Sequence, residues 1–375
     1  PKCTSGRAAQ KLAELRLCTS HDVFNCGVRL CTFPPHALGC ILLLPALHRL
    51  RLAGSGLFLP DTVVTAEELD ARFDLAPGWV AEKTGVLRRH FVGPHDSAAA
   101  MGAKALRRAL GDAQWPAESL DLIICASGTA HQPIPCTAVL ISEAMGARCA
   151  GVPAFDINAT CLSFLTALDV AALLIDSGRH RRVAIVSSEI ASRGLDWTDP
   201  ASAALFGDGA VATLLEATTD AIGIEAARME TYPEGAHLCE IRGGGTSLPS
   251  MQYTPERVHD YQFHMDGERL HKLAATHMPG FVTRLFEPLG VHPASLDAIV
   301  PHQAGRIPLL LLARRLGIDD QKLVMTLDEH GNTIAAGMPM ALHIARARHQ
   351  VRRGQRIALL GTGAGIAFAG CVWQL

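Results

Sequence analysis

The sequence predicts an α/β protein built from two similar halves. Uninterrupted apolar segments of strand length alternate with helical patterns along most of the chain, as in residues 120–126 (LDLIICA). Strands that are apolar throughout are typical of sheets that helices cover on both faces. The second observation is a pair of internal sequence matches at nearly equal spacing, which indicates a duplication.

The first half is expected over residues 51–218. Its opening segment, from Arg51 to residue 69, has the pattern of a strand, a turn and a helix. Thr65 as N-cap with Glu68 three residues later forms a capping box, which marks where this helix begins. Further helices are predicted at 98–110 and 135–145, and strands at 120–126, 152–157, 182–187 and 209–216.

The second half is expected over residues 219–375, because parts of the first half recur there. Residues 109–123 are echoed by 288–299, and residues 182–186 (RVAIV) by 356–360 (RIALL). The offset is 296 − 120 = 176 residues for the first match and 356 − 182 = 174 for the second. Matching order and offset favour duplication over chance. A site at the join of the halves can then draw residues from both.

Residues 1–50 differ from the rest and are predicted to be an extension of uncertain order. They show no clear periodicity beyond a helical pattern at 8–17. Five of the eleven cysteines lie here without the C-x-x-C pairing of zinc modules, so we expect no metal site. The remaining cysteines are scattered, which favours a reducing cytoplasm over a disulfide framework.

The composition excludes several classes of protein. The chain has 375 residues, 49% of them hydrophobic, and a formal net charge of −2, so nucleic acid is not an expected partner. No apolar run approaches the roughly 20 residues that span a bilayer, and no convincing signal peptide is present. We therefore expect a cytoplasmic protein without membrane insertion.

The candidate nucleophile is Cys161, which directly precedes a long apolar helical pattern at residues 162–175. A helix that is apolar on most faces is a buried helix. The positive end of its dipole and its free N–H groups are expected to stabilise a thiolate. The alternative is that Cys161 is one more buried apolar residue, the default for one cysteine among eleven.

Two further candidates lie in the second half. His302 ends a predicted strand at 299–302, and Asn332 precedes a predicted helix at 335–347. Under the duplication, both residues and Cys161 lie at the carboxyl ends of neighbouring strands, where α/β sheets place their sites. Taken separately, His302 could be a core histidine and Asn332 a turn or N-cap residue. Together they form a Cys/His/Asn set.

Five segments occur in the order in which one family has them. They are residues 156–161 (DINATC), 205–210 (LFGDGA), 300–304 (VPHQA), 330–336 (HGNTIAA) and 361–365 (GTGAG). On these segments the chain from Arg51 to Leu375 resembles the ketoacyl-acyl-carrier-protein synthase III family of condensing enzymes. The resemblance implies a thiolase-like fold, with two duplicated α/β halves in a five-layered αβαβα arrangement, and a homodimer.

The resemblance also implies the chemistry of the site. Cys161 would accept an acyl group as a thioester. His302 and Asn332 would donate hydrogen bonds to the thioester carbonyl of a malonyl-type substrate as it loses carbon dioxide. The backbone N–H groups of Cys161 and Ala364 would form the oxyanion hole. The product would be a 3-oxoacyl thioester, the partners acyl carrier protein, acyl-CoA or both, and no metal or redox cofactor would be needed.

Substrate-binding residues follow less closely from the resemblance. Trp79 matches a tryptophan that stacks on the coenzyme A adenine in acetyl-using members, Lys83 replaces a nearby arginine, and the second stacking residue falls at Pro200. Arg306 is a basic residue displaced by one position. Phe206 and Gly207, from the LFGDGA segment, are expected at the same site.

Ile134 stands where a bulky aromatic residue limits the acyl pocket in the acetyl-using members. The smaller side chain predicts a starter longer or more branched than acetyl, for fatty-acid or secondary-metabolite synthesis. Two alternatives stay open, namely the joining of two acyl chains and non-decarboxylative acyl transfer. A silent partner subunit is disfavoured because the Cys/His/Asn set is intact.

Overall fold

The structure is a computed structural model that describes residues 47–375. Most of the predicted extension, including the helical pattern at 8–17 and its five cysteines, lies outside the described residues. The first strand, β1 (His48–Phe58), begins slightly before the predicted boundary at residue 51.

Five strands of the first half form one sheet in the order β5-β4-β6-β7-β1. β4 is parallel to β5 and β6, whereas β7 is antiparallel to β6 and β1. Besides β1, these strands are β4 (Leu122–Ala126), β5 (Ala154–Ile157), β6 (Arg182–Glu189) and β7 (Gly209–Ala217).

The second half repeats this arrangement in the order β11-β12-β13-β8, and β8 pairs with the start of β1, so that the sheets of the two halves are continuous. Its strands are β8 (Gly223–Thr231), β11 (Ala298–Pro301), β12 (Arg356–Gly363) and β13 (Ala367–Gln374). β11 and β12 are parallel, and β13 is antiparallel to β12 and β8. Leu323 forms an isolated parallel bridge to Ile299, in the place where β5 pairs with β4. The repeated strand order supports the duplication inferred from the sequence.

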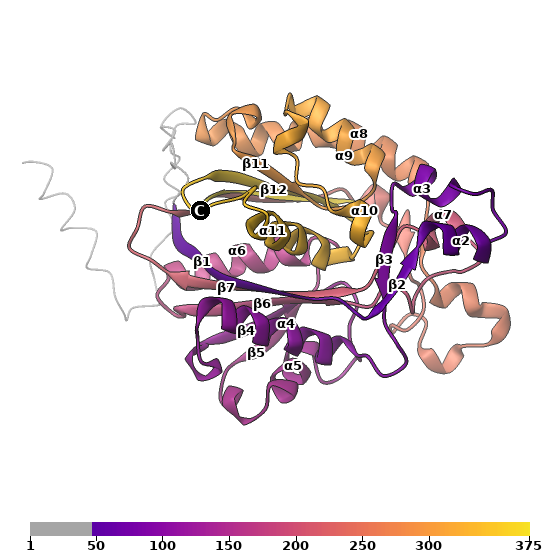
Figure 1. Cartoon of the computed structure of the whole chain (residues 1–375), viewed down its shortest axis with the longest axis horizontal. Coiled ribbons are helices and arrows are strands. Elements are labelled where there is room, and N and C mark those ends of the chain that lie inside the picture. Colours follow the sequence, from indigo (N-terminus) through magenta and orange to yellow (C-terminus); the bar gives the residue numbers. More distant parts are fainter. Residues whose placement is uncertain (1–46) are drawn as a thin grey trace, which may run out of the picture. The chain divides into compact units, whose positions relative to one another are not determined.

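Helices form three layers around the two sheets (Figure 1). α4 (Ala98–Ala113) and α5 (Thr137–Met145) cover the outer face of the first sheet. α6 (Ser163–Asp176) and α11 (Gly337–Ala347) lie between the sheets. α8 (Gly267–Phe286) and α9 (Arg306–Leu316) cover the second sheet. This is the predicted αβαβα arrangement.

α6 is apolar on most faces because it contacts strands of both sheets. Phe164, Leu168 and Ala171 are buried in a core cluster that also contains residues of α11 and of both sheets. Burying each large apolar side chain stabilises the fold by roughly 1.5–3 kcal/mol. The helix that follows Cys161 is therefore a rigid part of the core.

The remaining elements border this core. The capping box predicted at Thr65 and Glu68 is confirmed at the start of α2. α4 continues past Leu110, where its end was predicted, and α10 (Leu327–His330), between the Leu323 bridge and Asn332, was not predicted. The smaller elements are β2 (Thr62–Thr65), α2 (Ala66–Arg72), α3 (Trp79–Thr84), β3 (Arg88–Phe91), α7 (Pro200–Ala203), β9 (Cys239–Glu240), β10 (His264–Met265) and α10 (Leu327–His330).

Within residues 47–375, no helix has the length and apolar character needed to cross a membrane.

Candidate active site

A largely apolar cavity of about 550 Å³ brings the three predicted catalytic residues together. Cys161, His302 and Asn332 all line it, together with Phe206 and Ala364. Cys161 follows β5, His302 follows β11 and Ala364 follows β12, so these side chains reach the cavity from strand carboxyl ends. The duplication therefore predicted the strand-end positions of Cys161 and His302 correctly, whereas Asn332 lines the same cavity but follows α10 and not a strand.

Gly361 in β12 lets Leu162, the residue after Cys161, and His302 pack closely against the strand. A Cβ atom at Gly361 would lie 2.8 Å from Leu162 Cδ2 and 3.2 Å from His302 Cβ. Only glycine permits this approach without a shift of its neighbours. The His302 N–H donates to the Leu360 carbonyl at 2.8 Å, which fixes the histidine backbone to β12.

The turn before Cys161 is strained. Thr160 is β-branched and has φ of 51°, in the left-handed region that such residues rarely adopt. The Ser163 hydroxyl stabilises the turn by donating to the Thr160 carbonyl at 2.7 Å and accepting from the Ala159 N–H at 2.9 Å. Cys161 thus sits just ahead of α6, which begins at Ser163.

The protonation state of Cys161 is opposite to the expectation from the sequence. Burial in the apolar cavity raises its pKa to about 12, and the nearby Cys239 and Glu189 raise the pKa further. The backbone N–H groups of Cys161 and Ala364 lower the pKa by hydrogen bonding to the sulfur, but by less. The helix start is visible in the sequence, whereas the desolvation that outweighs it is not. The resting residue is a thiol.

His302 is neutral at physiological pH. Its side chain is buried, and burial lowers its pKa to about 4. Its Nδ1 atom has no hydrogen-bond partner among residues 47–375. A neutral imidazole offers one N–H donor and one acceptor nitrogen, so His302 can exchange a proton or donate a hydrogen bond in the cavity.

Hydrogen bonds with neighbouring backbone groups orient Asn332. Its Oδ1 atom accepts from the Ile334 N–H at 2.9 Å, which leaves the amide nitrogen to donate elsewhere. Its N–H donates to the Leu205 carbonyl at 2.9 Å, and the Gly207 N–H donates to its carbonyl at 3.1 Å. The LFGDGA segment therefore holds Asn332 in place.

Phe206 and Gly207 thus have different positions. Phe206 lines the cavity, whereas Gly207 is not among the residues described as lining it. A Cβ atom at Gly207 would lie 2.2 Å from the His330 carbonyl oxygen, so glycine is required where this segment passes the chain before Asn332. Gly207 therefore has a packing role in this structure, and its predicted role in substrate binding stays a prediction.

The other predicted substrate-binding residues lie outside the cavity. The described lining residues do not include Trp79, Lys83, Arg306 or Ile134. A Cβ atom at Gly85, which caps α3, would lie 2.6 Å from Arg306 Cβ, so the helix carrying Trp79 and Lys83 ends against the start of α9. Ile134 is 85% exposed.

Glu189 is a buried carboxyl group that sequence reasoning missed. It ends β6, and its carboxylate accepts from the N–H groups of Gly128 at 2.6 Å and Thr129 at 2.9 Å. Burial raises its pKa to about 7 although these hydrogen bonds lower it. Gly128 and Thr129 line the cavity. The available signal was an acidic residue directly after an apolar strand, but the predicted strand ended at residue 187.

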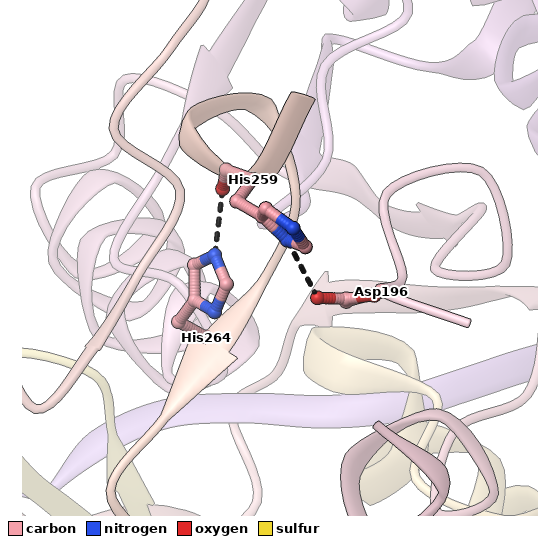
Figure 2. A group of neighbouring side chains, drawn as sticks. All are labelled: Asp196, His259 and His264. Atoms are coloured by element: carbon pink, nitrogen blue, oxygen red, sulfur yellow. Dashed lines mark hydrogen bonds and ion pairs between the residues drawn. The ribbon is translucent and has the colours of Figure 1, made fainter. Parts of the chain in front are cut away.

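Figure 2 shows a separate group of potential metal ligands, Asp196, His259 and His264, whose candidate atoms lie within 4.8 Å of one another. His259 Nδ1 lies 3.1 Å from an Asp196 carboxylate oxygen, and His264 Nε2 lies 2.6 Å from the His259 carbonyl. The neighbouring Leu195 and Phe263 line the cavity. These hydrogen bonds therefore stabilise, from outside the cavity, the segments that carry Leu195 and Phe263.

Comparison with known proteins shows the family to which the chain belongs. Residues 155–233 match the family described as 3-oxoacyl-[acyl-carrier-protein] synthase III, and residues 286–375 match the C-terminal part of the same family. A beta-ketoacyl-[acyl-carrier-protein] synthase III of Erythrobacter litoralis is 34% identical over 323 residues, which cover 85% of this chain and 97% of the relative.

Solved structures give the same result. The 3-oxoacyl-[acyl-carrier-protein] synthase III of Aquifex aeolicus superposes with a TM-score of 0.79 at 31% identity, over 87% of this chain and all of that one. The priming beta-ketosynthase of the R1128 polyketide biosynthetic pathway gives 0.79 at 27% identity, over 88% and 98% of the two chains. The chain therefore belongs to the 3-oxoacyl-[acyl-carrier-protein] synthase III family of acyl-transferring condensing enzymes.

Proposed function

We propose that this enzyme joins an acyl group held on Cys161 to a malonyl-type thioester by decarboxylative Claisen condensation. The observation that carries the proposal is the convergence of Cys161, His302 and Asn332 in one apolar cavity. The backbone N–H groups of Cys161 and Ala364, which hydrogen-bond to the Cys161 sulfur, are the further donors of the proposed active site.

In the first step the Cys161 sulfur attacks the carbonyl carbon of an acyl thioester. The thiol must lose its proton as the carbon–sulfur bond forms, because its pKa of about 12 keeps it protonated beforehand. Neutral His302 can relay that proton to the departing thiolate of the carrier as the carbon–sulfur bond forms, because bond formation acidifies the thiol whereas a pKa of about 4 makes His302 too weak a base to deprotonate it beforehand. The N–H groups of Cys161 and Ala364 stabilise the negative oxygen of the tetrahedral intermediate.

In the second step a malonyl-type thioester loses carbon dioxide. Its thioester oxygen gains negative charge as the enolate forms, and hydrogen bonds from His302 and Asn332 stabilise that charge. Both donors are neutral, so neither stabilises the carboxylate that must depart. The carbanion then attacks the acyl-Cys161 carbonyl, the carbon–sulfur bond breaks, and the thiolate takes up a proton. The product is a 3-oxoacyl thioester.

The substrates proposed are thioesters of acyl carrier protein, of coenzyme A, or of both. Trp79, Lys83 and Arg306 lie near the junction of α3 and α9, outside the cavity, where an aromatic ring and two cations suit a phosphate-bearing carrier. A starter longer than acetyl is supported by the volume and apolar walls of the cavity. The proposal covers synthesis of fatty acids or of secondary metabolites.

We further propose a cytoplasmic homodimer. β5 is the last strand of its sheet, and the apolar side chains of Ile134, Val139 and Phe155 are exposed on or near it. An exposed apolar patch beside an open strand edge is typical of an interface between copies. The described cysteines are free thiols, as a catalytic cysteine in a reducing compartment requires.

Intact-mass spectrometry tests the proposed chemistry. The enzyme is incubated with acyl thioesters of increasing chain length, then with malonyl thioester, and carbon dioxide and products are measured. We expect an acyl adduct on the wild-type chain that Cys161→Ala abolishes, followed by carbon dioxide release and a 3-oxoacyl product. Absence of any adduct would overturn the proposal. An adduct without carbon dioxide release would favour non-decarboxylative transfer or the joining of two acyl chains.

A further inference from the structure

The carboxyl group of Glu189 lies between a turn of the first half and a turn of the second half, beside the cavity. Glu189 is the last residue of β6 and is fully buried. β6 contacts the short helical turn Ile334–Ala336, which begins two residues after Asn332. A first-half carboxyl group therefore lies next to the second-half segment that carries a proposed catalytic donor.

Four uncharged donors hydrogen-bond to this carboxylate. Its Oε1 atom accepts from the Gly128 N–H at 2.6 Å, and its Oε2 atom accepts from the Thr129 N–H at 2.9 Å and from the Thr129 hydroxyl. The fourth donor is the Ala335 N–H. Gly128 and Thr129 belong to the turn after β4, so one side chain connects this turn to the chain that follows Asn332.

The Thr129 hydroxyl is arranged as a donor to the carboxylate. It accepts from the Ile190 N–H at 3.2 Å, which leaves its single proton free to point at Glu189. Hydrogen bonds to an ionised oxygen are roughly twice as strong as those between neutral groups. The three N–H donors cannot accept a hydrogen bond, so the surroundings of Glu189 suit a carboxylate better than a carboxylic acid.

The turn after β4 lies against both strained residues of the cavity. A Cβ atom at Gly128 would be 2.9 Å from Ile334 Cγ2 and 3.5 Å from the Thr160 carbonyl carbon. Both β-branched residues have positive φ, so packing of neighbouring segments must enforce their conformations. Thr160 precedes Cys161, and the Ile334 N–H orients the Asn332 amide. The position of this turn therefore affects the nucleophile and the donor together.

We infer that Glu189 is a positioning residue for decarboxylation, which fixes the Asn332 amide relative to Cys161 by holding the turns on both sides. Glu189 is not among the described residues that line the cavity, so it acts through the Ala335 N–H and the turn at Gly128. A misplacement of about 1 Å in a catalytic group can cost about 10²-fold in rate. The inference rests on the proposed condensation and adds how its donor is held.

Glu189→Gln tests this role through decarboxylation of malonyl-CoA. Glutamine keeps the size of the side chain, but it has one acceptor oxygen and places an NH₂ group against N–H donors. We expect kcat for carbon dioxide release to fall about 10–10²-fold with little change in KM, because the donor is misplaced after the substrate binds. Circular dichroism under assay conditions gives the fraction of folded enzyme, by which the rates are divided.

Asp121→Asn is the matched control. The Asp121 carboxylate also accepts from two backbone N–H groups, those of Arg181 and Arg182 at 2.8 and 2.9 Å. It joins the segments of β4 and β6 at the starts of these strands, whereas Glu189 joins them at their ends. We expect Asp121→Asn to leave kcat and KM for malonyl-CoA unchanged.

A double variant with Asn332→Asp distinguishes positioning from a general loss of structure. If Glu189 acts through Asn332, its replacement has no further effect once the amide donor is gone, so the two losses of rate do not multiply. A structural role would reduce the rate by the same factor in both backgrounds. Losses that multiply, or an unchanged kcat in Glu189→Gln, would overturn the inference.

Thr129→Val answers the same question if Glu189→Gln does not fold. Valine has nearly the shape of threonine, and it removes the hydroxyl donor while the N–H donors to Glu189 remain. We expect a smaller fall in kcat than for Glu189→Gln, and no fall in the Asn332→Asp background. An unchanged kcat, or an equal fall in both backgrounds, would contradict the positioning role.

The pH profile is a readout that a purely structural role would not change. Burial raises the pKa of Glu189 to about 7, so its carboxylate forms as pH rises through neutrality. The other titratable groups around it are Cys125 of β4 and Cys161, thiols that burial keeps protonated, and Asp208, which precedes its β7 partner Gly209. We expect kcat to increase severalfold from pH 6 to pH 8 in the wild type.

Glu189→Gln should lack this increase, because titration of the thiols and of Asp208 is retained in the variant whereas that of position 189 is removed. The same increase in both chains would assign it to another group and contradict the inference. If the wild type releases no carbon dioxide from malonyl-CoA, the proposed condensation is wrong and this role falls with it. If wild type and Glu189→Gln decarboxylate at equal rates, the reaction stands and Glu189 is only structural.

Discussion

At the residue scale, hydrogen bonds with the backbone orient the Asn332 side chain so that its amide nitrogen can donate. Its amide oxygen is engaged by the Ile334 N–H, and its main chain is held by Leu205 and Gly207. Ile334 itself has φ of 50°, an unfavourable conformation for a β-branched residue. The strain on both sides of the cavity, at Thr160 and Ile334, marks turns that the surrounding packing enforces.

Asn332→Asp separates the two proposed steps. Aspartate keeps the size of the side chain and the acceptor for Ile334, but it lacks the N–H donor for the enolate oxygen. We expect carbon dioxide release to fall about 10²–10³-fold, while acylation of Cys161 persists. The measurement combines rates of malonyl decarboxylation with intact mass. Unchanged decarboxylation would show that Asn332 is not a donor to the transition state.

The lowered pKa of His302 predicts that the free energy of unfolding depends on pH. Its pKa is about 4 in the folded protein and 6.5 in the unfolded chain. Between these pH values the unfolded state therefore binds more protons than the folded state. The stability that neutral His302 contributes is complete above pH 6.5 and is lost as pH falls toward 4. Over this pH range the free energy of unfolding is expected to fall by about 3 kcal/mol.

Urea unfolding at pH 7 and pH 5 checks this effect. The wild-type chain should lose more stability between these pH values than His302→Gln, which cannot titrate at this position. Equal losses in both chains would mean that His302 is not buried in its neutral form. The comparison cancels titration of the other groups, including the buried Glu189.

At the element scale, the connections between strands and helices decide the geometry of the site. The LFGDGA segment before β7 supports Asn332, and Glu189 at the end of β6 holds the turn after β4. The sequence predicted β4, β6 and β7 well because each contains a continuous apolar run, whereas β8, in which apolar and polar residues are mixed, was not predicted. It also missed α8, α9, α10 and the contacts of Glu189, which depend on segments far apart in the chain.

Gly207→Ala tests the support of Asn332. The new Cβ atom would lie 2.2 Å from the His330 backbone oxygen, so the two segments must move apart. We expect loss of condensation and a decrease in the free energy of unfolding of about 1–3 kcal/mol. Gly111→Ala in α4 is the control, because no atom outside its own helix lies within 4 Å. There alanine should preserve activity and increase stability by up to about 1 kcal/mol.

At the scale of the whole molecule, the open edge of β5 and the exposed apolar residues near it predict association. Phe155→Glu places a charge on this edge and should convert the proposed dimer to a monomer in sedimentation experiments. Leu173→Glu, at another exposed leucine, should leave the mass unchanged. A wild-type monomer, or a Phe155→Glu dimer, would contradict this interface.

The α/β class, the two similar halves and the candidate set Cys161/His302/Asn332 were predicted from the sequence alone. Apolar periodicity, internal matches and motif order can be recognised in the sequence itself. Strand carboxyl ends then place Cys161 and His302 at one edge, whereas Asn332 follows α10. Only the tertiary structure decided that burial raises the pKa of Cys161, that Gly207 packs against the His330 backbone, and that the cavity extends between α8 and α9. These features depend on burial and on contacts between distant segments, which no local pattern records.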